Sequence, residues 1–497
     1  MSRKRIIIVT IGIMFSIFLA SMESTVAATA MPTIVGELGG LEHYSWVFSA
    51  YMLASTTAVP LYGKLSDLYG RRLFFAIAMA FFLSGCILAG QAQTMTGLII
   101  ARALQGLGAG GIQPLSFILI GEMFSLEQRA KMQGLFSGVW GVSSIVGPLL
   151  GGILVEQLSW RWVFYINLIP GPIALALVLL AWKDTIHARG KITVDYLGAS
   201  LLTASVVALL LGLIDVRAPI SWALIALSIV LFTALLHVER RAAEPILPMH
   251  LFRGRLFTTA NAHGLLAGWA MFGSLSFIPL FVQSVLGTSA MQAGITLTPM
   301  LLGWVVASII GTRILLKVGF RKLSVLGTTL LVIGAALMAL VNADASQISI
   351  MVYVSVMGVG MGLSIPSFLI AIQTTVERRH LGTATSTLQF SRSMGGTLGV
   401  SVMGAALSSS LAANLSASGL DPQLVAQLLD PLGPQTVVDA GVRLALANAL
   451  HAVFLVASMA AFLAILAVFF LTPHMDLNER PQASVPTEDE PLIASMD

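Results

Sequence analysis

Long apolar runs separated by short polar segments alternate along almost the whole chain. A helix of about 20 residues crosses a hydrocarbon core of roughly 30 Å. Fourteen runs of sufficient length are predicted to span a membrane: 6–31, 44–62, 73–91, 96–120, 132–155, 163–182, 196–215, 220–238, 257–285, 292–316, 323–341, 348–372, 383–407 and 446–471. The pattern therefore predicts an all-α integral membrane protein with 14 transmembrane helices.

The composition agrees with this pattern. The chain of 497 residues is 57% hydrophobic and 10% charged, whereas soluble domains are about 25% charged. The first apolar run, 6–31, is longer than the roughly 7–15 residues of a signal-peptide core, so we interpret it as a retained first span. Two polar segments remain, 408–445 and the acidic tail 473–497, and the tail's composition is typical of disorder.

The distribution of Lys and Arg predicts the orientation. With the N-terminus inside, 21 of the 27 basic residues fall on the inner side, and three lie on the outer side: Arg161, Arg217 and Arg443. Short cytoplasmic segments carry such an excess of positive charge. We therefore expect both termini and the tail in the cytoplasm and 408–445 as an outer loop. The net charge of +4 follows from this topology, and no nucleic-acid partner is expected.

A carboxylate, Glu23, lies inside the first apolar run, in SMESTVAATAMP at 21–32. A charged residue at the centre of a bilayer costs about 2.5–3.5 kcal/mol on insertion scales, so it indicates a function by default. Glu23 is a candidate proton-coupling or substrate residue, because a carboxyl group changes its charge between two environments. The alternative is a side chain that reaches the outer interface, since Glu23 lies in the outer third of the run.

Glycine-rich motifs in the fourth and twelfth runs predict close helix packing. GLGAGG at 106–111 fits the dinucleotide pattern G-x-G-x-x-G, but it lies within an apolar span and no strand precedes it. Small residues at these spacings let two membrane helices approach closely. We interpret GVGMGLSIPS at 358–367 in the same way.

Three further motifs follow one another along the first half of the chain. They are GKLSDLYGRR at 63–72, R-x-x-Q-G beginning at Arg102, and GVSSIVGPLLGG at 141–152. The first, taken alone, is equally compatible with a solvated turn. In the third, Pro148 is expected to kink a helix, while Gly141, Gly147, Gly151 and Gly152 are expected to give close contact.

In this order, these motifs resemble the major facilitator superfamily, and in particular its fourteen-helix branch of drug:proton antiporters. The resemblance covers nearly the whole chain, apart from the tail and the outer loop. Further matching stretches are MESTVAATAMP on the first span, WRWVFYINLIPG at 160–171, DYLG at 195–198, PILPMHLFRGRLF at 245–257, QAGITLTP at 292–299 and GTATSTLQFSRSMGGTLG at 382–399. The resemblance implies a major facilitator fold with two six-helix bundles, 1–182 and 246–472, and an inserted helix pair at 183–245. It implies a monomer that moves the two bundles about a central cavity.

The resemblance also implies roles for single residues. Asp67 is expected to cap a helix of the other bundle at the cytoplasmic side and to pair with basic residues such as Arg71 or Arg129. Arg72 is a further candidate residue of the gate. Arg102 resembles the buried arginine that the family uses in proton coupling. Gly147 and Pro148, with Gly151 and Gly152, match the antiporter motif. The corresponding stretch on the first span usually carries Asp, where this chain has Glu23.

Two more residues are weaker candidates. Arg392, in QFSRSMGG, is either a packing residue or a cavity residue, and the sequence leaves both possibilities open. His263 is expected to be a neutral, hydrogen-bonded core histidine, although histidine also titrates near physiological pH. The last six spans contain no acidic residue, so we expect neutral or singly cationic lipophilic substrates rather than dications.

These features predict a secondary exporter in the cell membrane that exchanges lipophilic compounds for protons, of the multidrug efflux type associated with antibiotic resistance. The alternative is an exporter of a lipid or lipid-like metabolite. A membrane sensor is disfavoured because the loops are too short for a ligand-binding or signalling domain. No nucleophile constellation, metal-ligand cluster or nucleotide-binding loop is recognisable, so we expect no enzymatic activity, metal or cofactor.

Overall fold

The computed structural model describes residues 2–38, 44–183, 195–214, 218–242, 247, 249–288, 290–377, 380–418 and 440–473, and all its regular elements within them are helical. The helices of the first half are α1 (Arg3–Leu38), α2 (Tyr44–Tyr69), α3 (Arg71–Gly90), α4 (Met95–Met123), α5 (Leu126–Gln157), α6 (Trp162–Tyr165) and α7 (Pro170–Ala181), with a 3₁₀ turn, η2 (Ile166–Leu168), before α7. Two helices follow, α8 (Tyr196–Ile214) and α9 (Pro219–Glu239).

The second half contains α10 (Arg255–Leu280), α11 (Ala290–Val318), α12 (Phe320–Ala339), α13 (Gln347–Thr375), α14 (Leu381–Ser418) and α16 (Ala440–Leu471). A 3₁₀ turn, η3 (Leu251–Arg253), precedes α10 and a π-helical turn, η4 (Phe281–Val285), follows it. Among the described residues, eleven helical segments are long and apolar enough to cross a membrane. The fold is therefore that of an all-helical membrane protein with about fourteen long helices, and the count of 14 spans stays a prediction.

Several helix ends differ from the predicted runs by six or more residues, among them those of α2, α5 and α16. Helix α1 continues past residue 31 to Leu38. The run 163–182 is confirmed as a candidate span, Trp162–Ala181, but it consists of α6, η2 and α7 rather than one regular helix. Pro170 begins α7, a position where its missing N–H removes no helical hydrogen bond. Helix α14 extends through 408–418, which the sequence predicts as loop; residues 419–439 and 474–497, including the expected short helix and tail, lie outside the described residues.

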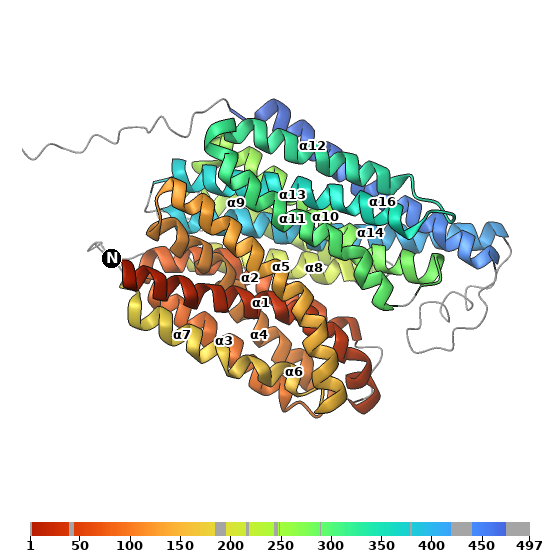
Figure 1. Cartoon of the computed structure of the whole chain (residues 1–497), viewed down its shortest axis with the longest axis horizontal. Helices are drawn as coiled ribbons and strands as arrows, with labels where there is room; N and C mark the ends of the chain where they lie inside the picture. Colours follow the sequence, from red (N-terminus) through yellow and green to blue (C-terminus); the bar gives the residue numbers. More distant parts are fainter. Residues whose placement is uncertain are drawn as a thin grey trace, which may run out of the picture.

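The helices pack in two groups. We call α1–α7 the first helix group and α10–α16 the second, because contacts concentrate within each. Helices α8 and α9 pack on each other, and α8 also packs on α2 and α14. In Figure 1 the two groups lie together at the end that carries the N-terminus, and their ribbons diverge toward the opposite end.

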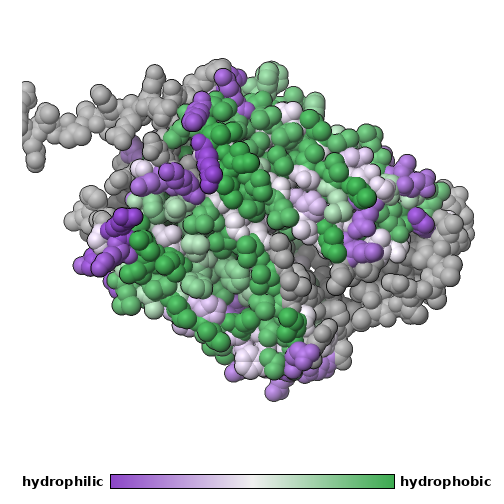
Figure 2. Space-filling view, in the orientation of Figure 1, coloured by the Kyte–Doolittle hydropathy of each residue, from purple (hydrophilic) through white to green (hydrophobic). Residues whose placement is uncertain are grey.

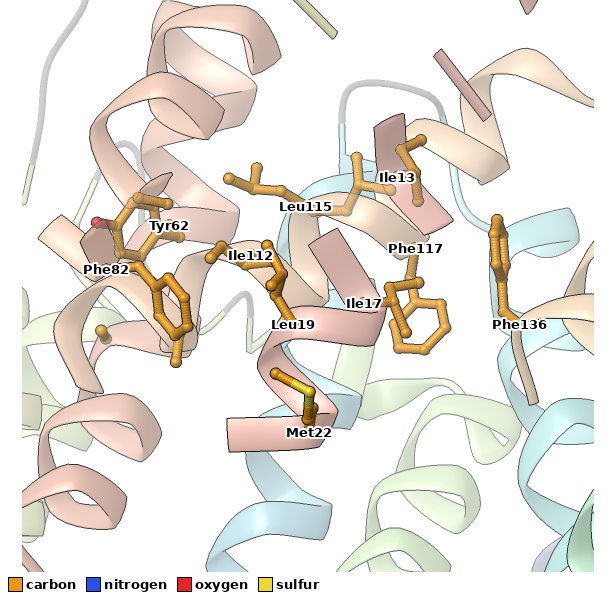
Figure 3. Packing of buried hydrophobic residues seen from close by; sticks show 14 of the residues in the cluster. Ile13, Ile17, Leu19, Met22, Tyr62, Phe82, Ile112, Leu115, Phe117 and Phe136 are labelled. Atoms are coloured by element: carbon orange, nitrogen blue, oxygen red, sulfur yellow. The ribbon is translucent and has the colours of Figure 1, made fainter. Parts of the chain in front are cut away.

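Apolar side chains fill the interior of the first helix group. Figure 3 shows side chains from α1, α2, α3, α4 and α5 in one buried cluster, in which Ile13, Phe82 and Ile112 have no exposed surface. A second cluster, with Met271, Phe281 and Phe454, fills the second helix group. Burying a charged group in such an apolar interior is costly, so the buried charges described below need compensating partners.

The glycine motifs lie where helices touch, which confirms the packing interpretation. A Cβ atom at Gly106 or Gly110 would lie within 2.4 Å of α2 backbone oxygens, and one at Gly108 would lie 2.3 Å from the Phe82 nitrogen of α3. In the second group, a Cβ atom at Gly358 or Gly362 would lie within 2.3 Å of α11 backbone oxygens. Helices α4 and α13 therefore use the same device, in which only glycine fits.

The outer surface is apolar around the middle of the molecule. Figure 2 shows a broad hydrophobic area between hydrophilic residues gathered toward the two ends. Large apolar side chains are exposed on many of the helices, among them Leu180 at 80% and Phe470 at 71%. Water disfavours such a surface and lipid tails do not, so the chain is a multi-pass membrane protein.

Candidate functional site

Glu23 forms a buried ion pair with Arg102. The Glu23 Oε1 atom of α1 lies 2.6 Å from Arg102 Nη1 of α4. The two side chains are 0% and 1% exposed. The alternative that the Glu23 side chain reaches the outer interface is therefore wrong. A buried carboxylate is tolerated when a charged partner and hydrogen bonds compensate for lost water.

Other polar side chains complete this pair. Asn167 Nδ2 donates to Glu23 Oε2 at 2.8 Å, and Arg102 Nη1 also donates to Gln105 Oε1 at 2.6 Å. Gln105 Nε2 in turn donates to the Cys86 sulfur at 3.1 Å. Arg102 and Gln105 are three residues apart and so lie on one face of α4. These five side chains form a polar network within the apolar interior of the first helix group.

A cavity of about 260 Å³ lies between the two helix groups. Both groups contribute its walls: Ile17, Ala20, Ser21, Tyr51, Met52, Ser55, Thr56, Val59, Ala109, Gly110, Gln113, Pro114, Phe117, Gln133, Phe136, Ser137 and Trp140 from the first, and Phe272, Trp304, Ile365, Pro366, Gln389, Arg392, Ser393 and Gly396 from the second. The walls are mainly apolar and aromatic with a few polar groups, which is typical of a site for small molecules.

The cavity adjoins the buried ion pair through one aromatic ring. Tyr51 lines the cavity, and the Arg102 guanidinium carbon lies 4.3 Å from the centre of its ring. Glu23 itself is not among the lining residues, although Ser21 on the same helix is. A movement of Tyr51 would therefore connect the cavity with the Glu23–Arg102 pair.

Asp67 joins the two helix groups at the N-terminus of α14. Its Oδ1 accepts a hydrogen bond from the Gly382 nitrogen at 3.2 Å, and its Oδ2 accepts from the nitrogen and hydroxyl of Thr383, each at 2.7 Å. A carboxylate at a helix N-terminus satisfies free N–H groups and interacts favourably with the helix dipole. Arg71, one turn along the chain, forms an ion pair with Asp67.

Basic residues surround this contact. Arg71 Nε donates to Glu122 Oε1 at 3.0 Å, and Arg129 Nη1 donates to the Gln373 carbonyl of α13 at 2.9 Å. Arg129 therefore bridges the groups at a second point. Arg72 is exposed on α3. We call the Asp67, Arg71 and Arg129 contacts the gate.

The antiporter motif lies on α5, which packs on α11. The hydroxyls of Ser137 and Ser308 are 2.7 Å apart, and the rings of Trp140 and Trp304 have centroids 4.9 Å apart.

The motif's glycines do not all behave as predicted. Gly147 and Gly151 are buried. A Cβ atom at Gly141 would lie 2.5 Å from Val305 Cγ2 of α11, a close contact as predicted. A Cβ atom at Gly152 would meet no atom of the described residues within 4 Å, so the structure gives no close contact there. The side chain of Pro148 lies outside the described residues.

The two weaker candidates have different surroundings. Arg392 lines the cavity, which resolves the alternative left by the sequence. His263 is 1% exposed and packs on Phe368, with ring centroids 4.8 Å apart. Its Nε2 atom has no hydrogen-bond partner among the described residues, so the predicted hydrogen bond is missing at that atom.

A further charged contact lies at the opposite end of the first helix group from the gate. Arg161 Nη1 and Trp160 Nε1 each donate to a different Glu37 oxygen at 2.6 Å. The hydrogen bond from Arg161, and then that from Trp160, hold the pKa of Glu37 below its usual value. Both partners lie in the first helix group, so this contact does not join the two groups.

Sequence reasoning missed several residues of the site. Asn167 gives the clearest available signal, because it is a polar residue in an apolar run. Tyr51, Trp140 and Trp304 give none, since aromatic residues are common at many positions of membrane helices. The direct partnership of Glu23 and Arg102 was not predicted either, because they are 79 positions apart in the chain.

Comparisons with known proteins agree with this architecture. The family model described as Major Facilitator Superfamily matches residues 13–400. The multidrug transporter protein MdtP of Bacillus subtilis is 38% identical over 427 residues, which cover 85% of this chain and 78% of that protein. Multidrug resistance protein 3 of Bacillus subtilis is 37% identical over 484 residues, covering 93% and 94%.

Solved structures share the fold. The human organic anion transporter MFSD10 (TETRAN) superposes with a TM-score of 0.64 at 14% identity, covering 95% of this chain and 100% of that chain. The proton:xylose symporter XylE superposes with a TM-score of 0.62 at 12% identity, covering 95% and 97%. The arrangement of helices, the family model and the bacterial relatives together establish that this chain belongs to the major facilitator superfamily and is a membrane transporter, not an enzyme.

Proposed function

We propose that this transporter is a proton-coupled antiporter that exports lipophilic compounds across the cell membrane by alternating access. The two moving bodies are six-helix bundles, residues 1–182 and 246–472, with 183–245 as an inserted pair. The proposal rests on the buried Glu23–Arg102 pair, in which Arg102 contacts the ring of Tyr51, a residue of the cavity wall. Multidrug transporters among the relatives support lipophilic drugs as substrates.

Protonation of Glu23 provides the coupling. The ionised carboxylate and Arg102 together carry no net charge, so the pair is tolerated in the apolar interior. A proton on Glu23 leaves Arg102 as an uncompensated buried charge, which is costly. The protonated protein therefore favours a different arrangement of α1 and α4, in which Arg102 reaches water or another partner. Tyr51, stacked on Arg102, transmits that change to the cavity.

The gate sets which side of the membrane the cavity faces. Asp67 and Arg129 link the two helix groups at the end that the charge distribution assigns to the cytoplasm. With these contacts made, the cavity is closed to the cytoplasm and the protein is in its outward-facing state. Breaking them admits substrate from inside.

The topology of this proposal has 14 spans with both termini in the cytoplasm. The 21-to-3 division of basic residues supports it. Reporter domains fused after Arg189 and after Gly419 are expected inside and outside, respectively. A reversed result at either position would contradict this topology.

Transport by purified protein in proteoliposomes tests the function. We expect an imposed pH gradient to drive uphill movement of lipophilic drugs, and an ionophore that abolishes that gradient to stop it. The same assay with an imposed membrane potential and no pH gradient shows whether transport is driven by the electrical potential or by the proton concentration difference. A substrate panel with neutral drugs, lipophilic ions and lipids separates drug export from the alternative, lipid export. Uphill transport that needs no ion gradient would contradict the proposal.

A further inference from the structure

Arg392 brings a positive charge into the cavity wall. Its neighbours Gln389, Ser393 and Gly396 on α14 line the same cavity. Its guanidinium makes neither a hydrogen bond nor an ion pair with any residue that the structure describes. A guanidinium carries five N–H donors, and leaving such a charge unpaired in a partly dry site is unfavourable. Arg392 is therefore available to a bound molecule.

The backbone around Arg392 is fixed on the opposite side. A Cβ atom at Gly268 would lie 2.4 Å from the Arg392 carbonyl oxygen, and one at Gly395 would lie 1.8 Å from the Leu265 carbonyl oxygen. Ser391 also donates to Asn261 Oδ1 of α10 at 2.8 Å. Helices α10 and α14 thus pack backbone to backbone here, which leaves the cavity as the side open to the Arg392 side chain.

The cavity wall contains no Asp or Glu. The nearest buried carboxylates have other partners, since Glu23 pairs with Arg102 and Asp67 pairs with Arg71. Within the described residues the wall therefore carries one formal positive charge and no negative one. Of the neutral or singly cationic substrates expected from the sequence, this arrangement gives no support to the cationic ones, because a cation in the cavity would face Arg392 without a counter-charge among the described lining residues.

The remaining wall suits a flat apolar body. Phe136, Trp140 and Trp304 line the cavity, and the two tryptophan rings are in contact. A planar guanidinium matches the two oxygens of a carboxylate or sulfonate, and such charged hydrogen bonds are stronger than neutral ones. Aromatic walls with one such group select for molecules that have an apolar part and one anionic end.

We propose that the cavity binds lipophilic organic acids, with the anionic group on Arg392 and the apolar body against the tryptophan wall. This inference rests on the proposed export function, since it names the substrate class of the same cavity. It predicts that ester or amide derivatives of a transported acid bind more weakly than the acid itself.

Equilibrium binding to the purified protein in a neutral detergent tests this. The probes are 1-pyrenebutyrate, 1-pyrenebutyramide and 1-pyrenebutylamine, which differ mainly in charge, and the signal is energy transfer from tryptophan to pyrene. We expect the wild-type protein to bind the acid about tenfold or more tightly than the amide or amine, as charged hydrogen bonds imply. Arg392→Gln should remove this difference, and Arg392→Lys should keep part of it.

Arg313→Gln is the matched control, because Arg313 is exposed on α11, and it should bind as the wild type does. Equal affinity for the three probes in the wild type, or an acid preference that survives in Arg392→Gln, would overturn the inference. So would full displacement of the acid by phosphatidylglycerol in the same micelles, which would assign Arg392 to a lipid headgroup. Binding needs no ion gradient, so failed pH-driven transport with an intact acid preference would contradict the export proposal alone.

Discussion

At the scale of single residues, the Glu23–Arg102 pair is stable only as a pair. Each charge compensates for the other's lost hydration, and Asn167 and Gln105 occupy further hydrogen-bonding positions. The low dielectric strengthens the attraction, and it also raises the cost of leaving one partner alone. Removing the arginine and removing the carboxylate charge are therefore different perturbations, although both break the same contact.

Arg102→Ala and Glu23→Gln should both destabilise the protein relative to the wild type, because each removes one charge of a buried pair. Breaking a buried pair from one side costs about 3–5 kcal/mol when the remaining charge is uncompensated. Glutamine in place of Glu23 keeps hydrogen-bonding atoms for Asn167 but leaves the Arg102 charge uncompensated, whereas the Glu23 carboxyl that remains in Arg102→Ala can take up a proton. Thermal unfolding in detergent measures the difference, with Arg313→Ala as a surface control. Equal melting temperatures for Arg102→Ala and wild type would show that water or lipid already solvates the pair.

The sequence identifies the two charged members of this network and not its geometry. Glu23 and Arg102 are visible because ionisable residues in apolar runs are rare. Their contact depends on how α1 packs on α4 in the tertiary structure, so no local sequence pattern predicts it. The sequence could not decide whether Arg392 is a packing residue or a cavity residue for the same reason. The residue type and its span do not say which face of α14 meets the cavity. Gate residues were better predicted, because the resemblance supplied both Asp67 and its helix.

At the scale of helices, glycine determines how closely neighbours approach. Helix α4 places Gly106 and Gly110, four residues apart, against α2, and α13 places Gly358 and Gly362 against α11. Close approach brings backbone atoms into contact, where a methyl group does not fit. The same spacing on both helices is the clearest sign that the two helix groups are built alike.

Gly110→Ala should lower the stability and the folded yield, because its Cβ would lie 2.3 Å from the Ser55 carbonyl oxygen. Overpacking of this kind costs about 1–3 kcal/mol. Gly152→Ala is the matched control, since its Cβ would meet nothing within 4 Å. Melting temperatures and size-exclusion profiles in detergent make the comparison. If both alanine variants behave alike, helix contact at Gly110 is looser than the structure has it.

Helix positions were predictable and several helix ends were not. Hydropathy reports where a segment meets lipid, but a helix can continue beyond the bilayer because its backbone hydrogen bonds are internal and do not depend on lipid. This explains why α14 extends to Ser418 through a polar stretch and why α1 extends to Leu38. The break before α7 follows from Pro170, a residue that hydropathy does not weigh as a helix breaker.

At the scale of the whole molecule, the gate links two bodies that must separate. The Asp67 carboxylate accepts hydrogen bonds from the backbone nitrogens of Gly382 and Thr383, and Arg129 donates one to the Gln373 carbonyl. The largest single contribution is the Asp67 carboxylate at the start of α14, because it combines charged hydrogen bonds with the helix dipole. Removing its charge should leave both bodies folded and shift the balance between them.

Asp67→Asn should open the gate in a larger fraction of molecules. A charged hydrogen bond contributes about 1.5–3 kcal/mol, which corresponds to a population shift of about tenfold or more. Spin labels on Leu73→Cys and Val318→Cys, both at exposed positions, report the separation by pulsed electron paramagnetic resonance. The native Cys86 is fully buried, so labelling is selective. We expect a longer distance to gain population in Asp67→Asn.

Ser66→Ala is the control for this experiment. Ser66 accepts a hydrogen bond from Arg71 within the first helix group, so its loss should leave the distance distribution unchanged. An unchanged distribution in Asp67→Asn as well would mean that the gate does not depend on this carboxylate.

The central claim is that Glu23 couples protons to transport, and one comparison tests it most directly. Wild type, Glu23→Gln and Glu23→Asp are reconstituted at matched protein content, and each is assayed for pH-driven accumulation and for exchange of labelled against unlabelled substrate without a gradient. Glutamine cannot release a proton, so Glu23→Gln should retain exchange and lose accumulation, while Glu23→Asp should keep partial accumulation. Accumulation at the wild-type rate in Glu23→Gln would contradict the account.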